Sequence, residues 1–149
     1  MNLQVTPATA ADRGPLLALL AAQMVEHDID IAETSLGAAI DGALADPRRG
    51  HFLVARVDGR PVGVAYLSMV WAIEHGGLSS WLEELYVLPA LREQGIGGRL
   101  LAAAMDHMRA LGCAAIDLEV EASHARVAGL YQRHGFRAHT RARWVLPLR

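Results

Sequence analysis

The stretch YVLPALREQGIGGRLL, residues 86–101, decides the fold predicted for this chain. The residues that lead into it, 80–87, are rich in aromatic and aliphatic side chains and predict a strand. Pro89 would end that strand, because proline cannot donate a hydrogen bond to a sheet ladder. Over residues 96–111 the apolar positions recur every three or four residues, which predicts an amphipathic helix that stops at Gly112. A short turn rich in glycine therefore joins a strand to a helix.

This turn has the features of an anion site. The first N–H groups of a helix have no partner inside the helix, and the helix dipole makes that end positive. Gly95 and Gly97 lack the Cβ atoms that would block a close approach, so a phosphate can rest on the N–H groups of residues 94–98. The same glycines would also suit a plain tight turn, and the spacing alone leaves both interpretations open.

Two common phosphate loops do not fit the turn. A dinucleotide-binding fingerprint needs a third glycine at position 100, which is Leu100. A Walker loop needs a lysine, and the chain contains none. The pattern that remains is Arg-x-x-Gly-x-Gly, formed by Arg92, Gly95 and Gly97 directly after the strand.

Composition and length indicate one folded domain over residues 1–149. Hydrophobic residues make up 52% of the chain, which favours a globular protein over a disordered one. No apolar run reaches the length of about 18 residues that a membrane span needs, and no signal peptide is visible at the N-terminus. Cys113 is the single cysteine, which excludes an internal disulfide. We therefore expect a cytoplasmic protein without a membrane partner.

Charge is divided unevenly along the chain, although the net charge is only −2. Residues 1–91 hold five Arg against eleven Asp and Glu, whereas residues 92–149 hold nine Arg against five. An acidic first part suits a cationic substrate and a basic second part suits a polyanionic cofactor, although an ordinary solvated surface would look the same. The charge is too small and too scattered for a nucleic-acid partner.

The remaining elements alternate between strands and helices. We expect helices from residue 10 to about 26, from 34 or 35 to 45, and from 123 to 134, and strands over 3–6, 50–57, 62–70, 114–120 and 138–148. Asp58-Gly59 predicts a hairpin turn, and Gly63 predicts a bulge or a close backbone approach. The order of elements indicates a sheet with parallel pairing around the later helices and antiparallel pairing elsewhere.

Three segments, taken together and in this order, resemble the GNAT N-acetyltransferase family. The first is the hairpin of residues 52–65, and the second is the strand end at 85–87 followed by residues 92–101. The third is LEVE at 118–121 followed by AGLYQRHGF at 128–136. With the opening strand and helices, the likeness covers nearly the whole chain. The segment WLEELYV, residues 81–87, is also similar to the diamine-acetyltransferase subgroup.

The resemblance implies a single α/β (α+β) domain with about four helices around a mixed sheet. In this family the sheet splays in the middle, and acetyl-CoA lies between the strands that correspond here to residues 81–88 and 115–121. The cofactor-binding residues that the resemblance implies are Leu85, Tyr86, Val87, Arg92, Glu93, Gln94, Gly95, Ile96, Gly97, Gly98 and His124. His124 stands where relatives often have Asn, so it is equally well explained as a residue at a helix start.

The catalytic residues follow from the same resemblance and from the chemistry of acyl transfer to an amine. Tyr131 matches the family's usual acid, which would protonate the departing thiolate, although a core tyrosine is the alternative. Glu83 and Glu84 are candidates for the base that removes a proton from the amine. Neighbouring strand residues face opposite sides, so at most one can serve unless a bulge intervenes. Exposed charges that protect a sheet edge are the alternative.

The acceptor is expected to be a small amine with a second positive charge. Asp28 and Asp30 lie in the acidic loop between the first two helices, with Glu26 and Glu33 beside them, and would attract such a ligand. A protein N-terminus or lysine as acceptor, or a non-catalytic acyl-CoA sensor, are the alternatives. A homodimer is the expected assembly. The histidines show no metal-ligand spacing, so no metal is expected.

Overall fold

The computed structural model describes residues 1–121 and 124–149, and these divide into two compact units. The first unit, residues 1–119, contains the whole sheet and three of the helices. The second unit, residues 120–149, contains helix α4 (Ala125–Arg133). Four α-helices and five strands in the described part of the chain agree with the mixed α/β fold predicted from sequence.

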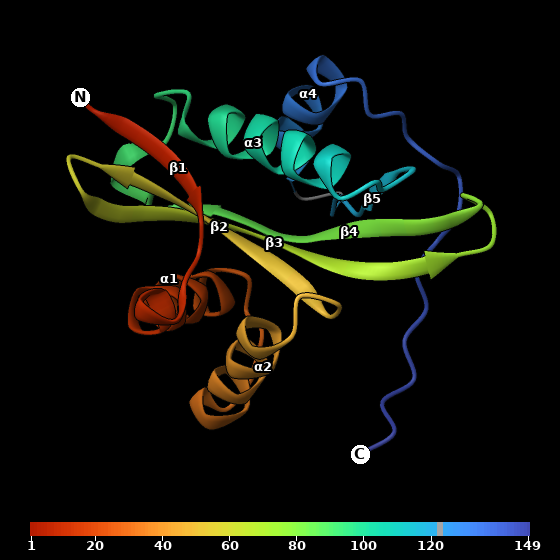
Figure 1. Cartoon of the computed structure of the whole chain (residues 1–149), viewed down its shortest axis with the longest axis horizontal. Helices are drawn as coiled ribbons and strands as arrows, with labels where there is room; N and C mark the ends of the chain where they lie inside the picture. Colours follow the sequence, from red (N-terminus) through yellow and green to blue (C-terminus); the bar gives the residue numbers. More distant parts are fainter. Residues whose placement is uncertain (122–123) are drawn as a thin grey trace. The chain divides into compact units, whose positions relative to one another are not determined.

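The sheet has five strands in the order of the chain. These are β1 (Leu3–Pro7), β2 (Gly50–Val57), β3 (Arg60–Ala72), β4 (Gly77–Val87) and β5 (Ile116–Leu118) (Figure 1). The first three pairings are antiparallel and the pairing of β4 with β5 is parallel, as the order of elements predicts. Asp58 and Gly59 both have positive φ, 49° and 81°, which confirms the predicted hairpin turn.

Helices cover both faces of the sheet. Helices α1 (Arg13–Glu26) and α2 (Glu33–Ala45) lie on one face, and α3 (Ile96–Ala110) lies on the other (Figure 1). The short 3₁₀ turns η1 (Ala10–Asp12) and η2 (Pro89–Leu91) lead into α1 and α3. Because both faces are covered, β2 buries four consecutive side chains, from Phe52 to Ala55, rather than every second one.

The apolar stripe of α3 holds this helix on the sheet. Its buried side chains recur at the spacing expected from the sequence: Ile96, Leu100, Leu101, Ala104 and Met108. Leu111, which the same periodicity places in the stripe, follows the last turn and is 39% exposed. Gly112 has φ 83°, the left-handed conformation of a helix stop. No helix among the described residues has the length and apolar character that crossing a bilayer requires.

The corner between β1 and α1 is held by Asp12. Its side chain accepts a hydrogen bond from the Thr9 N–H at 2.9 Å, which satisfies a donor at the start of the helix. The same carboxylate forms an ion pair with Arg56 of β2. Burial works to raise the pKa of Asp12, but the hydrogen bonds from Thr9 and Arg56 outweigh it, so the pKa lies below its usual value. The entry into α1 is therefore tied to the sheet.

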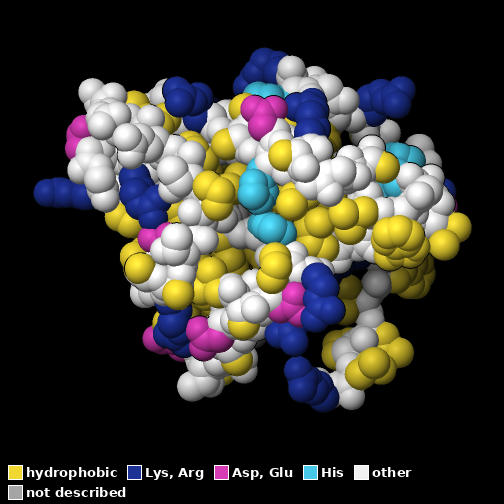
Figure 2. Space-filling model, in the orientation of Figure 1, with side chains coloured by type: hydrophobic (Ala, Val, Ile, Leu, Met, Phe, Trp, Pro, Cys, Tyr) yellow, Lys and Arg dark blue, Asp and Glu magenta, His cyan; other side chains and the backbone are white. Residues whose placement is uncertain are grey.

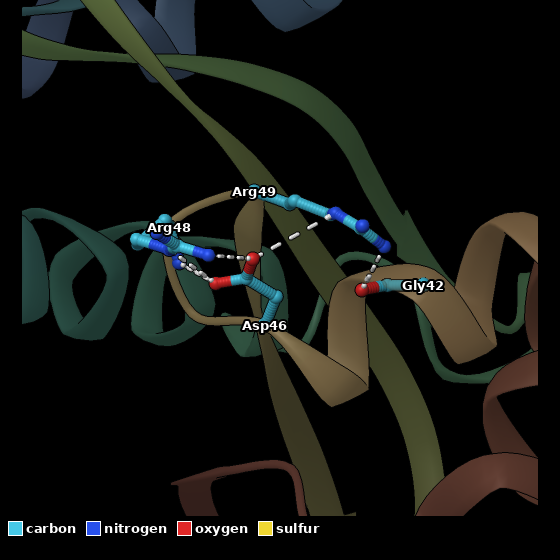
Figure 3. A network of polar contacts seen from close by, with 4 residues as sticks. All are labelled: Gly42, Asp46, Arg48 and Arg49. Atoms are coloured by element: carbon cyan, nitrogen blue, oxygen red, sulfur yellow. Dashed lines mark hydrogen bonds and ion pairs between the residues drawn. The ribbon is translucent and has the colours of Figure 1, made fainter.

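A second polar corner joins α2 to β2 (Figure 3). The Asp46 carboxylate accepts hydrogen bonds from the backbone N–H and guanidinium of Arg48, which lower its pKa to about 2. Arg49 donates from its guanidinium to the Gly42 carbonyl, 3.2 Å away, in the last turn of α2. The cation thereby satisfies a carbonyl that has no partner within the helix.

The last predicted strand is wrong. Residues 136–149 contain no strand, although the alternation within 138–148 fits the strand pattern. A strand forms only where a neighbour accepts its row of backbone hydrogen bonds, and the sequence pattern carries no information about that neighbour. Trp144 and Leu148 are at least 90% exposed. Strand β5 is also shorter than its predicted range of 114–120, and the predicted start of α4 at Ser123 lies outside the described residues.

Replacing Leu100 by alanine should destabilise the protein by about 2–5 kcal/mol, because this fully buried side chain fills the space between α3 and the sheet. Leu111→Ala is the matched control, and we expect it to cost less than about 1 kcal/mol. Urea unfolding followed by circular dichroism measures both values. Equal losses for the two variants would contradict the packing described for α3.

Candidate active site

One edge of β4 loses its partner halfway along the strand. Strand β3 accompanies β4 from Gly77 to Val87, whereas β5 pairs with it only from Ser80 to Leu82. Beyond Leu82 the described residues pair no strand with this edge over residues 83–87, although the Val87 carbonyl accepts a hydrogen bond from Arg92 Nε. A ligand with amide groups can add to such an edge as a further strand does. Leu85, Tyr86 and Val87, predicted from the resemblance, all lie on this open segment.

A β-bulge lies where the open edge begins. Tyr66 of β3 pairs with Glu84, but the next residue, Leu67, pairs with Leu82, so Glu83 has no opposite partner. A bulge interrupts the alternation of side chains between the two faces. The regular alternation that would allow only one of the two glutamates into a single site therefore does not hold at Glu83 and Glu84.

The two glutamates differ in their surroundings. Glu83 is exposed, whereas Glu84 is half-buried beside Tyr66. Burial, and then the neighbouring charge of Glu83, raise the pKa of Glu84 to about 7. Burial and Glu83 also raise the pKa of Tyr66, whose ring stacks on Phe52 with centroids 4.5 Å apart. A carboxylate with this pKa can take up and release a proton near neutral pH, which is what a general base requires.

The glycine turn exposes amide groups at the start of α3. Gly95 has φ 81° and caps the helix, and the residue two positions earlier, Glu93, has φ 63°. The first helical bond runs from the Arg99 N–H to the Gly95 carbonyl at 3.1 Å. The N–H groups of residues 96–98 have no backbone acceptor in the described part of the chain. These donors lie within residues 94–98, where the sequence predicts an anion site, and the binding of a phosphate there stays a prediction.

The positive φ at position 95 favours glycine there, whereas the space around the residue would admit a side chain. A Cβ atom added to this residue would meet nothing within 4 Å. Its positive φ, however, is a conformation that other residues adopt at a cost. Gly63 shows the opposite case, since an added Cβ would lie 2.9 Å from the Tyr86 carbonyl oxygen. The close backbone approach predicted at Gly63 is therefore confirmed, and it brings β3 tightly against the strand that carries the site.

Arg92 lies in this turn, but its hydrogen bonds go to protein groups. The two terminal nitrogens of its guanidinium donate to the two carboxylate oxygens of Glu26, each at 2.7 Å. Its Nε donates to the Val87 carbonyl at 2.9 Å, and its Cζ lies 5.4 Å from the centre of the Tyr86 ring. The hydrogen bonds from Arg92 lower the pKa of Glu26. Sequence reasoning missed this contact, because nothing in the local pattern links residues 66 positions apart.

The acidic loop between α1 and α2 is exposed. Asp28 and Asp30 have no ion-pair partner among the described residues, and Asp28 has φ 55°. Glu26, which the sequence places with them, is instead bound to Arg92. Of the four acidic residues, Asp28, Asp30 and Glu33 therefore stay candidates for attracting a cationic ligand, and this role stays a prediction.

Tyr131 and His124 belong to the second unit. Tyr131 lies on α4, and its ring packs edge to face against Phe136 with centroids 5.8 Å apart. His124 precedes α4, and its Nδ1 lies 3.6 Å from a Glu121 carboxylate oxygen. The predicted helix with Tyr131 near its end is confirmed, while the acid role of Tyr131 and the cofactor contact of His124 stay predictions.

The described residues contain no cluster of three or more histidine, cysteine or acidic side chains that could hold a metal ion. Three histidines form pairs with residues distant in the chain: His51 with His107 at 3.0 Å, and His75 with Asp117 at 2.8 Å. Basic and acidic side chains are interspersed on the face shown in Figure 2. This mixture differs from the single-sign field of a nucleic-acid surface.

Comparison with known proteins identifies what the chain is similar to. A family model described as the acetyltransferase (GNAT) family matches residues 17–136. The aminoalkylphosphonate N-acetyltransferase of Salmonella typhimurium is 29% identical over 130 residues, which cover 87% of this chain and 82% of that protein. The aminoglycoside N(6')-acetyltransferase type 1 of Klebsiella aerogenes is 32% identical, with 74% of this chain and 70% of that protein covered.

A solved structure extends the likeness to the whole fold. The aminoglycoside N-acetyltransferase AAC(6')-Iy, crystallised in complex with CoA, superposes with a TM-score of 0.84. The match covers 99% of this chain and 95% of that chain at 18% sequence identity. At this identity the likeness concerns the arrangement of helices and strands.

The raised pKa of Glu84 predicts a pH-dependent stability. The folded state holds the Glu84 proton up to a pKa of about 7, whereas the unfolded chain releases it near 4.5. The free energy of unfolding should therefore fall as pH rises between these values, and Glu84→Gln should remove this fall. Glu83→Gln is the control and should keep most of it. Urea unfolding at pH 4.5, 6 and 8 measures the difference, and identical pH profiles for wild type and Glu84→Gln would contradict the buried carboxyl.

Proposed function

Because this chain belongs to the acetyltransferase (GNAT) family and is an acetyltransferase, we propose that it moves the acetyl group of acetyl-CoA to a small cationic primary amine. The observation that carries the proposal is Glu84, a half-buried carboxyl with a pKa of about 7 at the start of the open edge of β4. A base of this strength is needed only if the acceptor must lose a proton before it reacts.

The residues of the cofactor site fit acetyl-CoA, which supplies an activated acetyl thioester when it is bound. The free N–H groups at the start of α3 suit its pyrophosphate, because both the orphan donors and the helix dipole favour negative charge. The open edge at residues 83–87 suits its amide-containing arm. Arm and phosphates would then occupy successive segments of the chain, and the predicted cofactor residues from Leu85 to Gly98 lie along this path.

Glu84 is the proposed base. An ammonium group cannot attack a carbonyl carbon until it has lost a proton, and a carboxylate with a near-neutral pKa can accept that proton directly or through water. Glu83 is exposed, and its contribution is to raise the pKa of Glu84 by the repulsion between two like charges. The two glutamates thus have different roles, one as the proton acceptor and the other as its electrostatic neighbour.

Tyr131 is the proposed acid. When the tetrahedral intermediate collapses, the coenzyme leaves as a thiolate anion. A phenol with a reference pKa near 10 can protonate this thiolate to the thiol. The resemblance of AGLYQRHGF, residues 128–136, to the family's third motif supports this role. His124 is kept as a proposed cofactor contact. The homodimer and the cytoplasmic location expected from the sequence also stay predictions.

An amine screen tests the proposed function. Purified protein with acetyl-CoA should release free thiol with diamines, polyamines or basic amino acids. The panel should include an aminoglycoside and an aminoalkylphosphonate, because relatives are named for these substrates. Tight CoA binding with no thiol release from any amine would favour a non-catalytic sensor. Release only with peptides would favour a protein acetyltransferase.

Changing Tyr131 to Phe should lower kcat by roughly 10²-fold, because the substitution keeps the ring but removes the only proton that it can give. Affinity for acetyl-CoA, measured by calorimetry, should stay close to wild type. A wild-type rate in this variant would assign Tyr131 to the hydrophobic core. The phenylalanine ring can keep the edge-to-face contact with Phe136, so a change in rate would not come from lost packing.

Neutralising Asp28 and Asp30 to Asn should raise KM for a dicationic amine by about fivefold at low salt and leave kcat nearly unchanged. Asparagine also tolerates the left-handed conformation found at Asp28. Asp58→Asn is the matched control, since Asp58 is an aspartate with positive φ in a turn elsewhere. If the effect does not shrink as salt is raised, or if neutral and anionic amines react as fast as dications, the cationic specificity is wrong.

A further inference from the structure

Arg92 joins three parts of the first unit through one side chain. It reaches Glu26, the last residue of α1, the carbonyl of Val87 at the end of β4, and the ring of Tyr86. Helix α1 lies on one face of the sheet, while the turn that carries Arg92 leads to α3 on the other face (Figure 1). The ion pair therefore links the two layers around the end of β4.

The position of Glu26 at the end of α1 favours a cation beside it. A carboxylate in the last turn of a helix faces the negative end of the helix dipole, and α1 has no basic residue in this turn. Arg92 supplies the missing positive charge in a bidentate geometry, which fixes the direction as well as the distance of the contact. Both side chains are more than a third exposed, so the pair acts on orientation more than on overall stability.

The acceptor-side loop leaves α1 directly after this contact. Residues 27–32 follow Glu26 and carry Asp28 and Asp30 before α2 begins at Glu33. Backbone bonds close the helix end, with the Ile29 N–H donating to the Met24 carbonyl at 2.8 Å. The Glu26–Arg92 ion pair at the end of α1 thus bears on the direction in which the loop leaves the helix. Arg92 of the same ion pair also lies against the ring of Tyr86, which is in β4 two residues after Glu84, the proposed base.

We propose that Glu26 and Arg92 are positioning residues, whose ion pair ties the end of α1 to the end of β4, orients the loop of residues 27–32 and so sets the affinity for the acceptor amine. This inference rests on the proposed function, which it deepens by separating Arg92 from the phosphate site. Three of the donors of Arg92 are already engaged by Glu26 and Val87. The backbone amides of residues 96–98, which have no backbone acceptor in the described part of the chain, are then the proposed donors to the cofactor's phosphates.

A double-mutant cycle tests the proposed role of the Glu26–Arg92 ion pair. Glu26→Gln, Arg92→Gln and the double variant should each raise the acceptor KM by about fivefold, since each removes the same interaction. Affinity for acetyl-CoA, measured by calorimetry, should stay within about twofold of wild type. Gly97→Val provides the comparison, because a β-branched side chain in the phosphate loop should abolish that affinity.

Hydrogen exchange provides a readout that does not depend on turnover. Amides of residues 27–32 should exchange faster in Glu26→Gln and Arg92→Gln than in wild type. Asp41→Asn is the matched control, because it breaks the similarly exposed, bidentate pair of Arg13 and Asp41 between α1 and α2. That variant should leave both acceptor KM and exchange in this loop unchanged.

The opposite pattern would overturn the inference. If Arg92→Gln weakens acetyl-CoA binding as Gly97→Val does, while Glu26→Gln alters neither acceptor KM nor exchange, Arg92 is a phosphate ligand. The Glu26–Arg92 pair then does not position the loop of residues 27–32. Failure of the proposed function looks different: the wild-type protein would then acetylate no amine. The exchange of residues 27–32 would still decide whether the ion pair holds the loop.

Discussion

Strand β4 has hydrogen-bonded partners on both edges only as far as Leu82, and the candidate site depends on this limit. Buried backbone N–H and C=O groups are costly to leave without hydrogen-bond partners. A strand edge without a neighbouring strand therefore favours binding of a ligand or water that supplies these partners. Here β3 keeps the strand extended on one side while the other side stays available. The bulge at Glu83 falls at the point where the partner ends.

The bulge also explains how a charged pair can occupy a sheet that is covered on both faces. In a regular strand, one of two neighbouring glutamates would point into each apolar layer, and an isolated buried charge is strongly unfavourable. With the alternation broken, Glu83 stays exposed while Glu84 is half-buried next to it. Burial and the neighbouring charge then act in the same direction and raise the pKa of Glu84 into the range where proton transfer is efficient.

The proposed base and most of the proposed cofactor contacts lie in one continuous segment, residues 83–98, and helices on both faces of the sheet support it. Helix α3 is anchored by its apolar stripe, so the amide groups at its first turn are held in place. On the other face, α1 is held by its apolar side chains and by the Glu26–Arg92 pair. A solved structure with CoA has a similar arrangement of helices and strands.

The sequence by itself determined most of the fold: the two-residue hairpin turn, the strand that Pro89 ends, the helix stripe from Ile96 to Met108, and the glycine turn that leads into this helix. These features are local, because turn chemistry and periodicity are written in neighbouring residues. Only the tertiary structure decided that β5 stops at Leu118, that residues 138–148 form no strand, that Glu83 bulges, and that Glu26 binds Arg92. Each of these depends on a partner distant in the chain, and a local pattern cannot say which backbone or side chain will be there to pair with it.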